Sequence, residues 1–456
     1  MMNKEKVEQT PRDLSLYIHI PFCKSKCIYC DFLSFGACRY EEQAQYVKAL
    51  CKEIGSYTDI AKDYKIRTIF IGGGTPSYIN DNFIEDIMDA VKQTFVVDED
   101  AEITIEGNPD SLTRDKLRTY HAIGINRLSI GLQSANDAML ATLNRVHNYD
   151  QFIAAYQSAR QEGFTNINVD LMSGLPGETA DSYIRTLAKV AELNPEHISA
   201  YSLIVEEGTP LEQRDDLLDL LPSEEEDRKL YAKTKMFLKN SGYERYEISN
   251  YAKRGYACRH NLVYWTGGEY LGVGLGASSY LTIYMEDQSV EKIRFHGTEN
   301  MEEYIARFLQ SDGMQGDEYT TMFHAYEYEE ENVYGFDDAY GMYMDMNTNA
   351  ADANLQKYRA YEDNPLLEFV RDYYKDLHFQ KRRDEMEECM FLGLRCMNGV
   401  SKQMFHDRFG VEMESIYAKA IEKHKKQGLL AEEEGRIFLT DKGIDVSNLV
   451  MADFML

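Results

Sequence analysis

The sequence predicts an α/β fold, a partial (β/α)6 barrel followed by a small C-terminal α+β lobe that is winged-helix-like. Two observations predict the barrel: the first half of the chain holds six apolar, β-branched runs, and a helical pattern separates each run from the next. Strands that alternate with helices in this way imply a parallel sheet with right-handed crossovers. Because a closed barrel of this kind has eight units, six units predict a barrel that is open on one side.

The predicted elements divide the chain into four parts. The strands are predicted at 14–20, 66–71, 101–106, 127–130, 166–172 and 197–203, and the helices at 41–60, 80–93, 113–122, 136–143, 149–162 and 179–192. Further helices are predicted at 385–397, 401–408 and 412–427, with a β-hairpin at 428–440 that Glu434-Gly435 closes. We therefore expect a barrel core at 1–210, its completion at 211–312, an acidic and tyrosine-rich insertion at 313–384, and the C-terminal lobe at 385–456.

Three cysteines in CxxxCxxC spacing follow the first predicted strand; they are Cys23, Cys27 and Cys30. This spacing can hold three corners of a [4Fe–4S] cluster. Such clusters usually take four thiolates, so three would leave one iron open to another ligand, such as a small molecule. Cys38 and Cys51 are candidates for a fourth thiolate ligand. The alternative to a cluster is a zinc site of Cys3His type that uses His19 or a distant histidine.

A glycine-rich loop follows the second predicted strand. Gly72, Gly73 and Gly74 precede Thr75-Pro76, and successive glycines let a backbone approach a ligand closely and direct N–H groups at it. A glycine run alone is more often a turn. Here the glycine loop follows the CxxxCxxC run by one βα unit, and Tyr29 lies between the last two cysteines. This combination of motifs resembles the radical S-adenosylmethionine (SAM) superfamily. In that superfamily the methionine end of SAM binds the fourth iron, which makes zinc the less favoured interpretation.

Polar residues occupy the ends of the later predicted strands. Glu106 follows the third strand, Gln133 the fourth, and Asp170 lies near the end of the fifth. Each alone could cap a helix. Because the chemistry of parallel α/β barrels lies at the C-terminal ends of the strands, the ordered set predicts a ligand that they share with the cysteine and glycine loops.

Longer motifs narrow the resemblance. The runs Leu16-Tyr-Ile-His-Ile-Pro-Phe-Cys, Ile125-Asn-Arg-Leu-Ser-Ile-Gly-Leu-Gln-Ser and Asn168-Val-Asp-Leu-Met-Ser-Gly-Leu-Pro-Gly look like the oxygen-independent coproporphyrinogen III oxidase family, over about 14–310 and again from about 385. The resemblance implies iron ligation by the three cysteines. It implies a SAM site lined by Tyr17, Gly73, Gly74, Thr75, Glu106, Gln133, Arg145 and Asp170. A surface cation at a helix end is the plainer interpretation of Arg145.

Two branches of this family differ at one position after the cysteines. The decarboxylating oxidase has a fourth cysteine there and a longer N-terminal arm, whereas this chain has Phe32 and only 22 residues before Cys23. The haem chaperone branch, HemW, has phenylalanine there and an HNxxYW motif, which is found here from His260 to Trp265. That branch implies binding of haem and its transfer to haem-acceptor proteins, with an electron donor for the cluster, and leaves enzymatic activity open.

Two other functions remain as alternatives. The first is an oxygen-independent coproporphyrinogen III oxidase, a dehydrogenase-like oxidoreductase that converts propionates to vinyls through a 5′-deoxyadenosyl radical. The second is a zinc-binding scaffold. His260 itself has two interpretations of equal weight: a haem ligand, since histidine commonly holds haem iron, or part of a hydrogen-bonded seam. Cys258 is a second ligand candidate.

Composition favours a cytoplasmic protein. The net charge of −28 argues against a nucleic-acid surface, since phosphate contacts need Lys and Arg. No apolar run is long enough to span a bilayer, and the charged start lacks the apolar stretch of a secretory signal. Thiolates that bind a cluster need a reducing compartment. A homodimer is compatible with the sequence.

Overall fold

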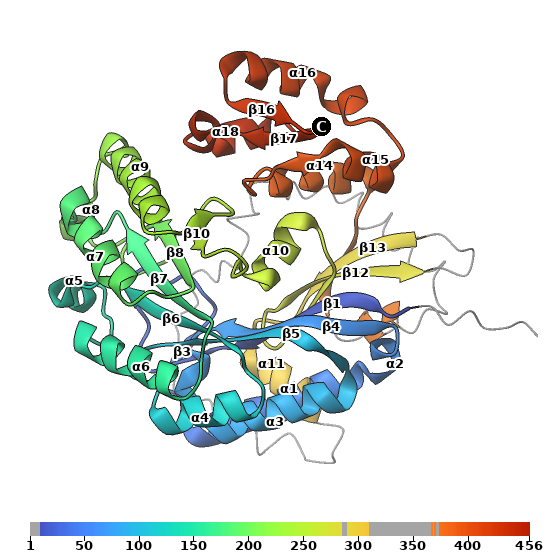
Figure 1. Ribbon diagram of the computed structural model, residues 1–456. Coiled ribbons are helices and arrows are strands. Elements are labelled where there is room, and N and C mark those ends of the chain that lie inside the picture. The colour runs from blue at the N-terminus through green and yellow to red at the C-terminus, as the bar shows by residue number, and fades with distance from the viewer. Residues whose placement is uncertain (1–9, 285–289, 310–365, 368, 371–373) are drawn as a thin grey trace, which may run out of the picture.

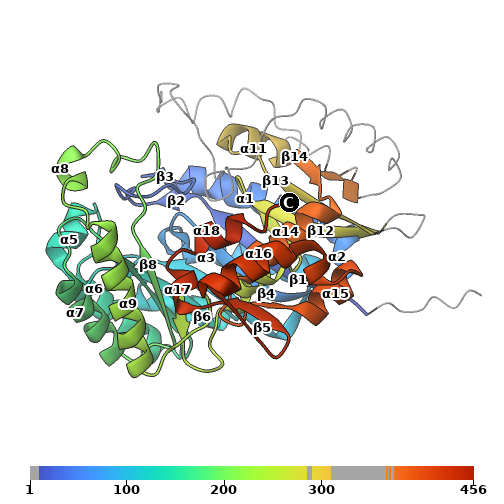
Figure 2. The same ribbon diagram turned by 90° about the horizontal axis from the view of Figure 1, so that it is seen from above.

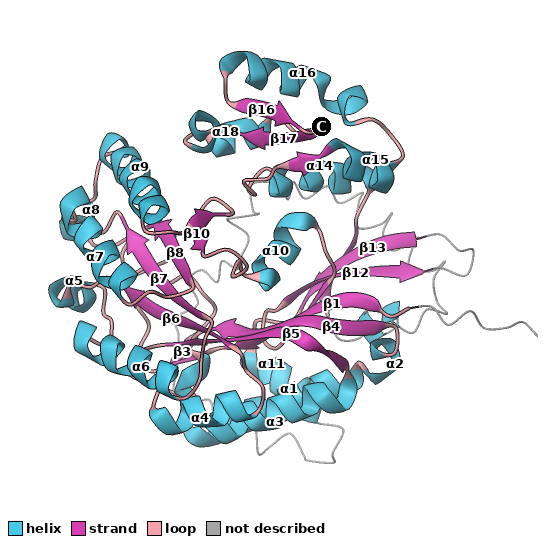
Figure 3. Ribbon diagram, in the orientation of Figure 1, coloured by secondary structure: helices cyan, strands magenta, loops and turns pink. Residues whose placement is uncertain are grey.

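One large curved sheet organises the molecule. The computed structural model describes residues 10–284, 290–309, 366–367, 369–370 and 374–456. Twelve strands form this sheet, in the order β14-β13-β12-β11-β1-β4-β5-β6-β7-β8-β10-β9. Helices cover its convex side, while α10 (Arg259–Thr266) and the C-terminal lobe lie on the concave side (Figures 1 and 3).

The six predicted strands are confirmed as parallel neighbours at the centre of this sheet. They are β1 (Arg12–Ile20), β4 (Tyr64–Gly73), β5 (Val96–Gly107), β6 (Arg127–Gln133), β7 (Ile167–Ser173) and β8 (His197–Ser202). The predicted helices between them are also found: α1 (Tyr40–Ser56) with α2 (Thr58–Ala61), α3 (Asp81–Thr94), α4 (Arg114–Ala122), α5 (Asp137–Thr142), α6 (Tyr149–Gln161) and α7 (Ala180–Glu192). The partial (β/α)6 barrel is therefore the observed fold.

The two faces of these strands differ in polarity. On β1, Leu14, Leu16, Ile18 and Ile20 join the hydrophobic core, and they alternate with Ser15, Tyr17 and His19. Side chains alternate between faces along a strand. Strands of parallel sheets are usually apolar on both faces, so a polar inner face marks the barrel interior as a place where a polar ligand or polar network is held.

Both edges of the barrel are extended by shorter strands. Beside β1 lie the parallel β11 (Tyr270–Val273) and then the antiparallel β12 (Ser278–Tyr284), β13 (Val290–His296) and β14 (Lys375–Phe379). Beside β8 lie β10 (Asn250–Ala252) and β9 (Glu244–Arg245). The connecting helices are α8 (Asp215–Leu218), α9 (Glu224–Asn240) and α11 (Met301–Leu309).

The far end of the predicted insertion is part of the barrel body. β14 pairs with β13, and Leu366, Leu367, Val370 and Tyr374 are buried in the main hydrophobic core. Residues 310–365, the larger part of the predicted insertion, lie outside the described residues. The domain boundaries at 210, 312 and 384 stay predictions.

The C-terminal lobe has its own hydrophobic core. The predicted three helices and hairpin are found: α14 (Arg382–Gly393), α15 (Lys402–Phe409), α16 (Met413–Gln427), β16 (Leu430–Glu433) and β17 (Arg436–Leu439), with β15 (Val400–Ser401) completing a small sheet. Glu434 and Gly435 close the hairpin with φ values of 49° and 73°. Two further helices, α17 (Asp441–Ile444) and α18 (Ser447–Ala452), were not predicted. Figure 2 shows this lobe over the middle of the sheet.

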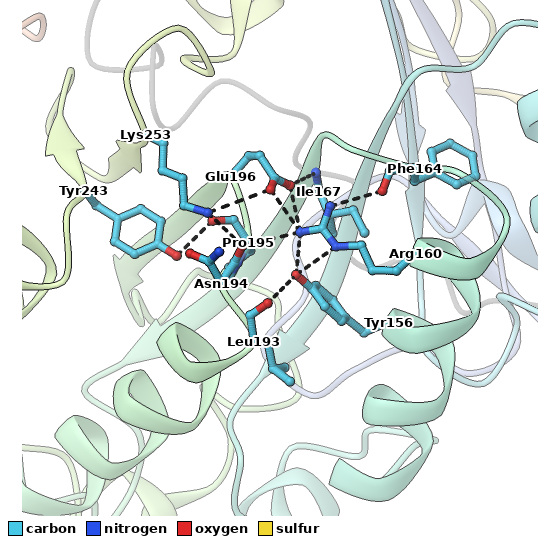
Figure 4. A network of polar contacts seen from close by, with 10 residues as sticks. All are labelled: Tyr156, Arg160, Phe164, Ile167, Leu193, Asn194, Pro195, Glu196, Tyr243 and Lys253. Carbon is cyan, nitrogen blue, oxygen red and sulfur yellow. Dashed lines mark hydrogen bonds and ion pairs between the residues drawn. The ribbon is translucent and has the colours of Figure 1, made fainter.

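A polar network fixes the start of β7 and β8, at the end of the strands away from the cysteine loop (Figure 4). Glu196 accepts from the backbone N of Ile167 at 3.1 Å and pairs with Arg160 at 2.8 Å. Arg160 also donates to the Tyr156 hydroxyl at 2.6 Å. Because these polar groups pair with one another, we interpret the network as stabilising the starts of the two strands. In the described parts of the chain, no helix combines the length and apolar character needed to cross a membrane.

Candidate functional site

The cysteine loop is folded back onto the barrel by short-range pairing. Cys23 ends β2 (Phe22–Cys23), which pairs with β3 (Phe35–Gly36) and so closes the loop between them. Ile28, inside the loop, donates its backbone N–H to Leu143 O at 3.3 Å and accepts from Leu211 N at 2.8 Å. The loop is therefore held by segments that follow β6 and β8, at the C-terminal end of the barrel.

Two of the three thiols have polar partners from other parts of the barrel. The Thr75 hydroxyl lies 3.5 Å from Cys23 Sγ, and Arg145 Nη1 lies 3.4 Å from Cys27 Sγ. Burial raises the pKa of the Cys30 thiol to about 11 and also raises that of Cys23. Within the described residues, no group of three or more His, Cys, Asp or Glu side chains stands at positions that could hold a metal ion. The assignment of these cysteines as iron ligands stays a prediction from their spacing.

The glycine loop contacts both the cysteine loop and β5. A Cβ atom at Gly74 would lie 2.9 Å from Phe22 O and 3.0 Å from Cys23 Sγ, closer than real Cβ contacts allow. Gly73 has φ of 113°, and its N–H donates to Glu106 Oε2 at 3.2 Å. Glycine is therefore required by both backbone conformation and space, and the loop places a backbone N–H beside a carboxylate.

Tyr17 and His19 line the end of β1. The Tyr17 hydroxyl and His19 Nδ1 share a hydrogen bond of 3.0 Å, and His19 Nε2 is 2.9 Å from Leu33 O. Burial lowers the pKa of His19 to about 4, so its imidazole is neutral. Because both ring nitrogens already have protein partners, His19 is poorly placed as the fourth ligand of a zinc site.

Glu106 and Asp170 form a pair of neighbouring carboxyl groups. Burial, and then the charge of Asp170, raises the pKa of Glu106 to about 8. Burial also raises the pKa of Asp170, which accepts from Ser129 Oγ at 3.0 Å and from Asn168 Nδ2 at 2.7 Å. Two neighbouring buried carboxyl groups with raised pKa values are suited to a cationic ligand, because a positive charge favours ionisation of both.

Arg145 lies inside the site and not at a helix surface. Its Nη2 donates to Gly131 O at 2.6 Å and to Asn108 Oδ1, while its Nε is buried without a partner among the described residues. Asn108 also donates to Thr75 Oγ1 at 3.2 Å. The sequence analysis did not single out Asn108, although its position two residues after Glu106 was an available signal.

Gln133 has an unusual backbone conformation at the end of β6. Its φ of 68° lies in the left-handed region that residues other than glycine rarely adopt, and its Oε1 accepts from the Tyr201 hydroxyl at 2.8 Å. Backbone strain of this kind concentrates at functional sites. Tyr201, near the end of β8, is a second residue that the sequence analysis missed.

His260 lies apart from the cysteine loop, on α10. Its Nδ1 is 2.8 Å from Thr68 Oγ1, its Nε2 is 2.9 Å from the Tyr264 hydroxyl, and its ring stacks on Phe70 at 5.2 Å. Burial, and then the charge of Arg127, lowers the pKa of His260 to about 3. With both nitrogens engaged, the geometry favours the hydrogen-bonded seam, and a role as haem ligand stays a prediction.

The fold and this convergence of loops at one barrel end define a radical SAM protein. The Radical SAM superfamily profile matches residues 17–190, and the HemN C-terminal domain profile matches 380–446. Membership of this superfamily implies SAM and a [4Fe–4S] cluster.

Curated relatives identify the family. "Heme chaperone HemW" of Bacillus subtilis is 30% identical over 445 residues, which is 97% of this chain and 99% of that protein. The protein of the same name from Escherichia coli is 38% identical over 269 residues, 59% of this chain and 70% of that one. The chain belongs to the HemW family. Its fold also resembles the coproporphyrinogen III oxidase HemN of Escherichia coli, with a TM-score of 0.72 at 24% identity over 98% of this chain and 90% of that one.

Proposed function

We propose that this chain is a haem chaperone of the HemW type, which binds haem and passes it to acceptor proteins. The observation that carries the proposal is the match to a named haem chaperone over almost the full length of both chains. A second observation supports it. Phe32, with 51% of its surface exposed, stands beside the cysteine loop where the decarboxylating branch has a fourth cysteine.

We also propose the residues that hold the two cofactors. Cys23, Cys27 and Cys30 would bind the [4Fe–4S] cluster; Tyr17, Gly73, Gly74, Thr75, Glu106, Gln133, Arg145 and Asp170 would hold SAM. One observation supports a polar ligand such as SAM in this site: Arg145 has a buried Nε without a partner in the described chain. When bound, a reduced cluster would supply the electron that cleaves the sulfonium of SAM.

The chain's own groups would each have a distinct task in this site. The Gly73 N–H and the Glu106 carboxylate would orient the methionine end, since their 3.2 Å contact already fixes one relative to the other. Arg145, which contacts Cys27 Sγ at 3.4 Å, would bind a carboxylate of the ligand. Asp170 would accept from ribose hydroxyls, because Ser129 and Asn168 hold it in place.

The partners follow from this function. They are haem, haem-acceptor proteins and an electron donor to the cluster, with a homodimer as a further possibility. We place the protein in the cytoplasm, because thiolate ligands need a reducing compartment. The alternative function is oxidative decarboxylation of coproporphyrinogen III, because the chain shares its fold with the coproporphyrinogen III oxidase HemN.

One experiment separates the two functions. Protein reconstituted without oxygen is titrated with haem, followed by its Soret band, and is separately incubated with coproporphyrinogen III, SAM and a reductant. The proposal requires saturable haem binding, transfer of haem to an apo-protein, and no protoporphyrinogen IX. Sustained formation of protoporphyrinogen IX would identify an oxidase. The variant Phe32→Cys serves as control, since a cysteine at this position alone is not expected to create turnover.

A further inference from the structure

The barrel interior contains a buried arginine without a partner. Arg127, at the start of β6, is 2% exposed; within the described residues its side chain forms no hydrogen bond or ion pair, and its Nε is buried. It stands directly opposite Thr104 on β5, which is fully buried and whose Oγ1 is also unpaired among the described residues. Since buried polar atoms are nearly always satisfied, two adjacent exceptions indicate that ordered water or another polar group is held between them.

Several titratable groups face Arg127 from the elements packed around it. They are Glu102 and Glu106 on β5, Asp170 on β7, His197 on β8, Tyr246 between β9 and β10, Cys258 just before α10, and His260 on α10. Both histidines are neutral at pH 7, because burial, and then the charge of Arg127, lowers their pKa values. Burial raises the pKa of the Cys258 thiol to about 12 and raises that of the Tyr246 hydroxyl. Within this set, Arg127 is therefore the only cation, and three carboxyl groups surround it.

The Glu102 carboxyl group is already committed to α10. It accepts from the backbone N of His260 at 3.1 Å and of Arg259 at 3.2 Å, and from Cys258 Sγ at 3.6 Å. Glu102 therefore serves the start of that helix. The two remaining carboxyl groups, Glu106 and Asp170, are those that face the proposed SAM site.

We propose that Arg127 is a positioning residue for that site, the counter-charge that allows Glu106 and Asp170 to ionise and receive a cationic ligand. Because Arg127 forms no direct ion pair with either carboxylate, it would favour their charge without occupying the oxygen lone pairs that the ligand needs. Glu106 keeps Oε2 for Gly73 N, and Asp170 keeps its bonds to Ser129 and Asn168. The proposal rests on the proposed SAM site and is independent of haem transfer.

The test compares three variants of the reconstituted protein between pH 6 and 9. Arg127→Met removes the charge at similar length, Arg127→Lys keeps a cation, and Thr104→Val is a matched control at the facing position. SAM affinity is measured by calorimetry, and ionisation of the carboxyl groups by infrared titration without SAM. For Arg127→Met we expect the midpoint of both profiles to rise by about one pH unit, with SAM binding about tenfold weaker at pH 7. Arg127→Lys should show a smaller shift in the same direction, and Thr104→Val none.

The outcomes distinguish a wrong role for Arg127 from a wrong assignment of the SAM site. Equal infrared midpoints in the native protein and Arg127→Met would overturn the role of Arg127. If Arg127→Met yields no folded protein, Arg127→Gln, which also removes the charge, replaces it in the same measurement, and midpoints equal to those of the native protein would overturn the proposal. Absence of SAM binding by the native protein would refute the cofactor site, while the infrared titration would still report on Arg127.

Discussion

The hydroxyl of Tyr374 donates a hydrogen bond of 2.6 Å to Oε1 of Glu53, in the interior of the barrel body. Glu53 is 1% exposed, and its Oε2 accepts from the Tyr304 hydroxyl and from Gly274 N. Burial raises the pKa of this carboxyl group, and its hydrogen-bond donors oppose the shift. Since Tyr374 lies within the predicted insertion at 313–384, the far end of that segment helps to hold Glu53 and therefore α1 in place.

Removal of this single hydroxyl should destabilise the protein. We expect Tyr374→Phe to lower the free energy of unfolding by about 1–3 kcal/mol, because it leaves one buried oxygen of Glu53 without a donor. Chemical denaturation followed by circular dichroism measures this change. Tyr284→Phe, at a residue with 56% exposure, is the control and should change nothing. Equal stability of Tyr374→Phe and the native protein would show that the Glu53 contact contributes little.

The insertion can be shortened only up to the buried segment. We expect that replacing residues 313–362 by a short flexible linker leaves folding and cluster binding intact, since the free energy of loop closure depends only weakly on loop length. A deletion extended to His378 removes Leu366, Leu367 and most of β14, so it should lose soluble protein. Yield and iron content after reconstitution distinguish the two. Equal yields would mean that this packing is dispensable.

The cluster should depend on the three clustered cysteines and on pH. Alanine at any one of Cys23, Cys27 and Cys30 should reduce iron and sulfide uptake, whereas Cys38→Ala, whose thiol donates only to Gly36 O at 3.9 Å, should not. Burial raises the pKa values of Cys23 and Cys30, and iron binding releases the thiol protons, so reconstitution should improve from pH 7 to pH 9. Stoichiometric zinc in protein purified without oxygen, with no cluster after reconstitution, would contradict this prediction.

Glu106 should make stability fall as pH rises. Its folded-state pKa of about 8 exceeds the unfolded value, so between about pH 4.3 and pH 8 the folded state binds more protons and loses stability with increasing pH. Glu106→Gln should therefore stabilise the SAM-free protein by about 1–3 kcal/mol above pH 8, yet weaken SAM binding. Glu178→Gln is the matched control, because burial raises the pKa of Glu178 to about 7 and Glu178 is not among the residues proposed to hold SAM. It should leave SAM binding unchanged.

The His260 ring should matter for stability more than for the haem spectrum. We expect His260→Ala to lower the free energy of unfolding by about 2–4 kcal/mol, as it removes two hydrogen bonds and leaves a cavity beside Phe70. The Soret band of the haem complex should keep its position. Tyr264→Phe, which removes only the partner of Nε2, should show a smaller loss of stability. A shifted band with haem affinity weakened more than about tenfold would instead identify His260 as an axial ligand.

The barrel and most of its site could be predicted because local patterns determine them. β-branched runs, glycine loops and strand-end carboxyl groups carry their own signals, and the charge of Asp170 acts on Glu106 in the structure, as expected for the ends of parallel strands. That these residues hold SAM stays a prediction. Other features depend on contacts between distant residues. β14 was not predicted because it lies near the end of the predicted insertion and pairs with β13, which precedes that insertion. Asn108 gains its role only through Arg145 and Thr75.

The two backbone hydrogen bonds of Ile28 have a consequence for biosynthesis. The cysteine loop leaves the ribosome before Leu143 and Leu211, the two residues that hold Ile28 in place. The three thiols therefore reach their final arrangement only after Leu211 has been translated. Iron delivery in the cell would have to wait for this late stage, and a nascent chain that stops before Leu211 would expose thiols that its own fold does not yet protect.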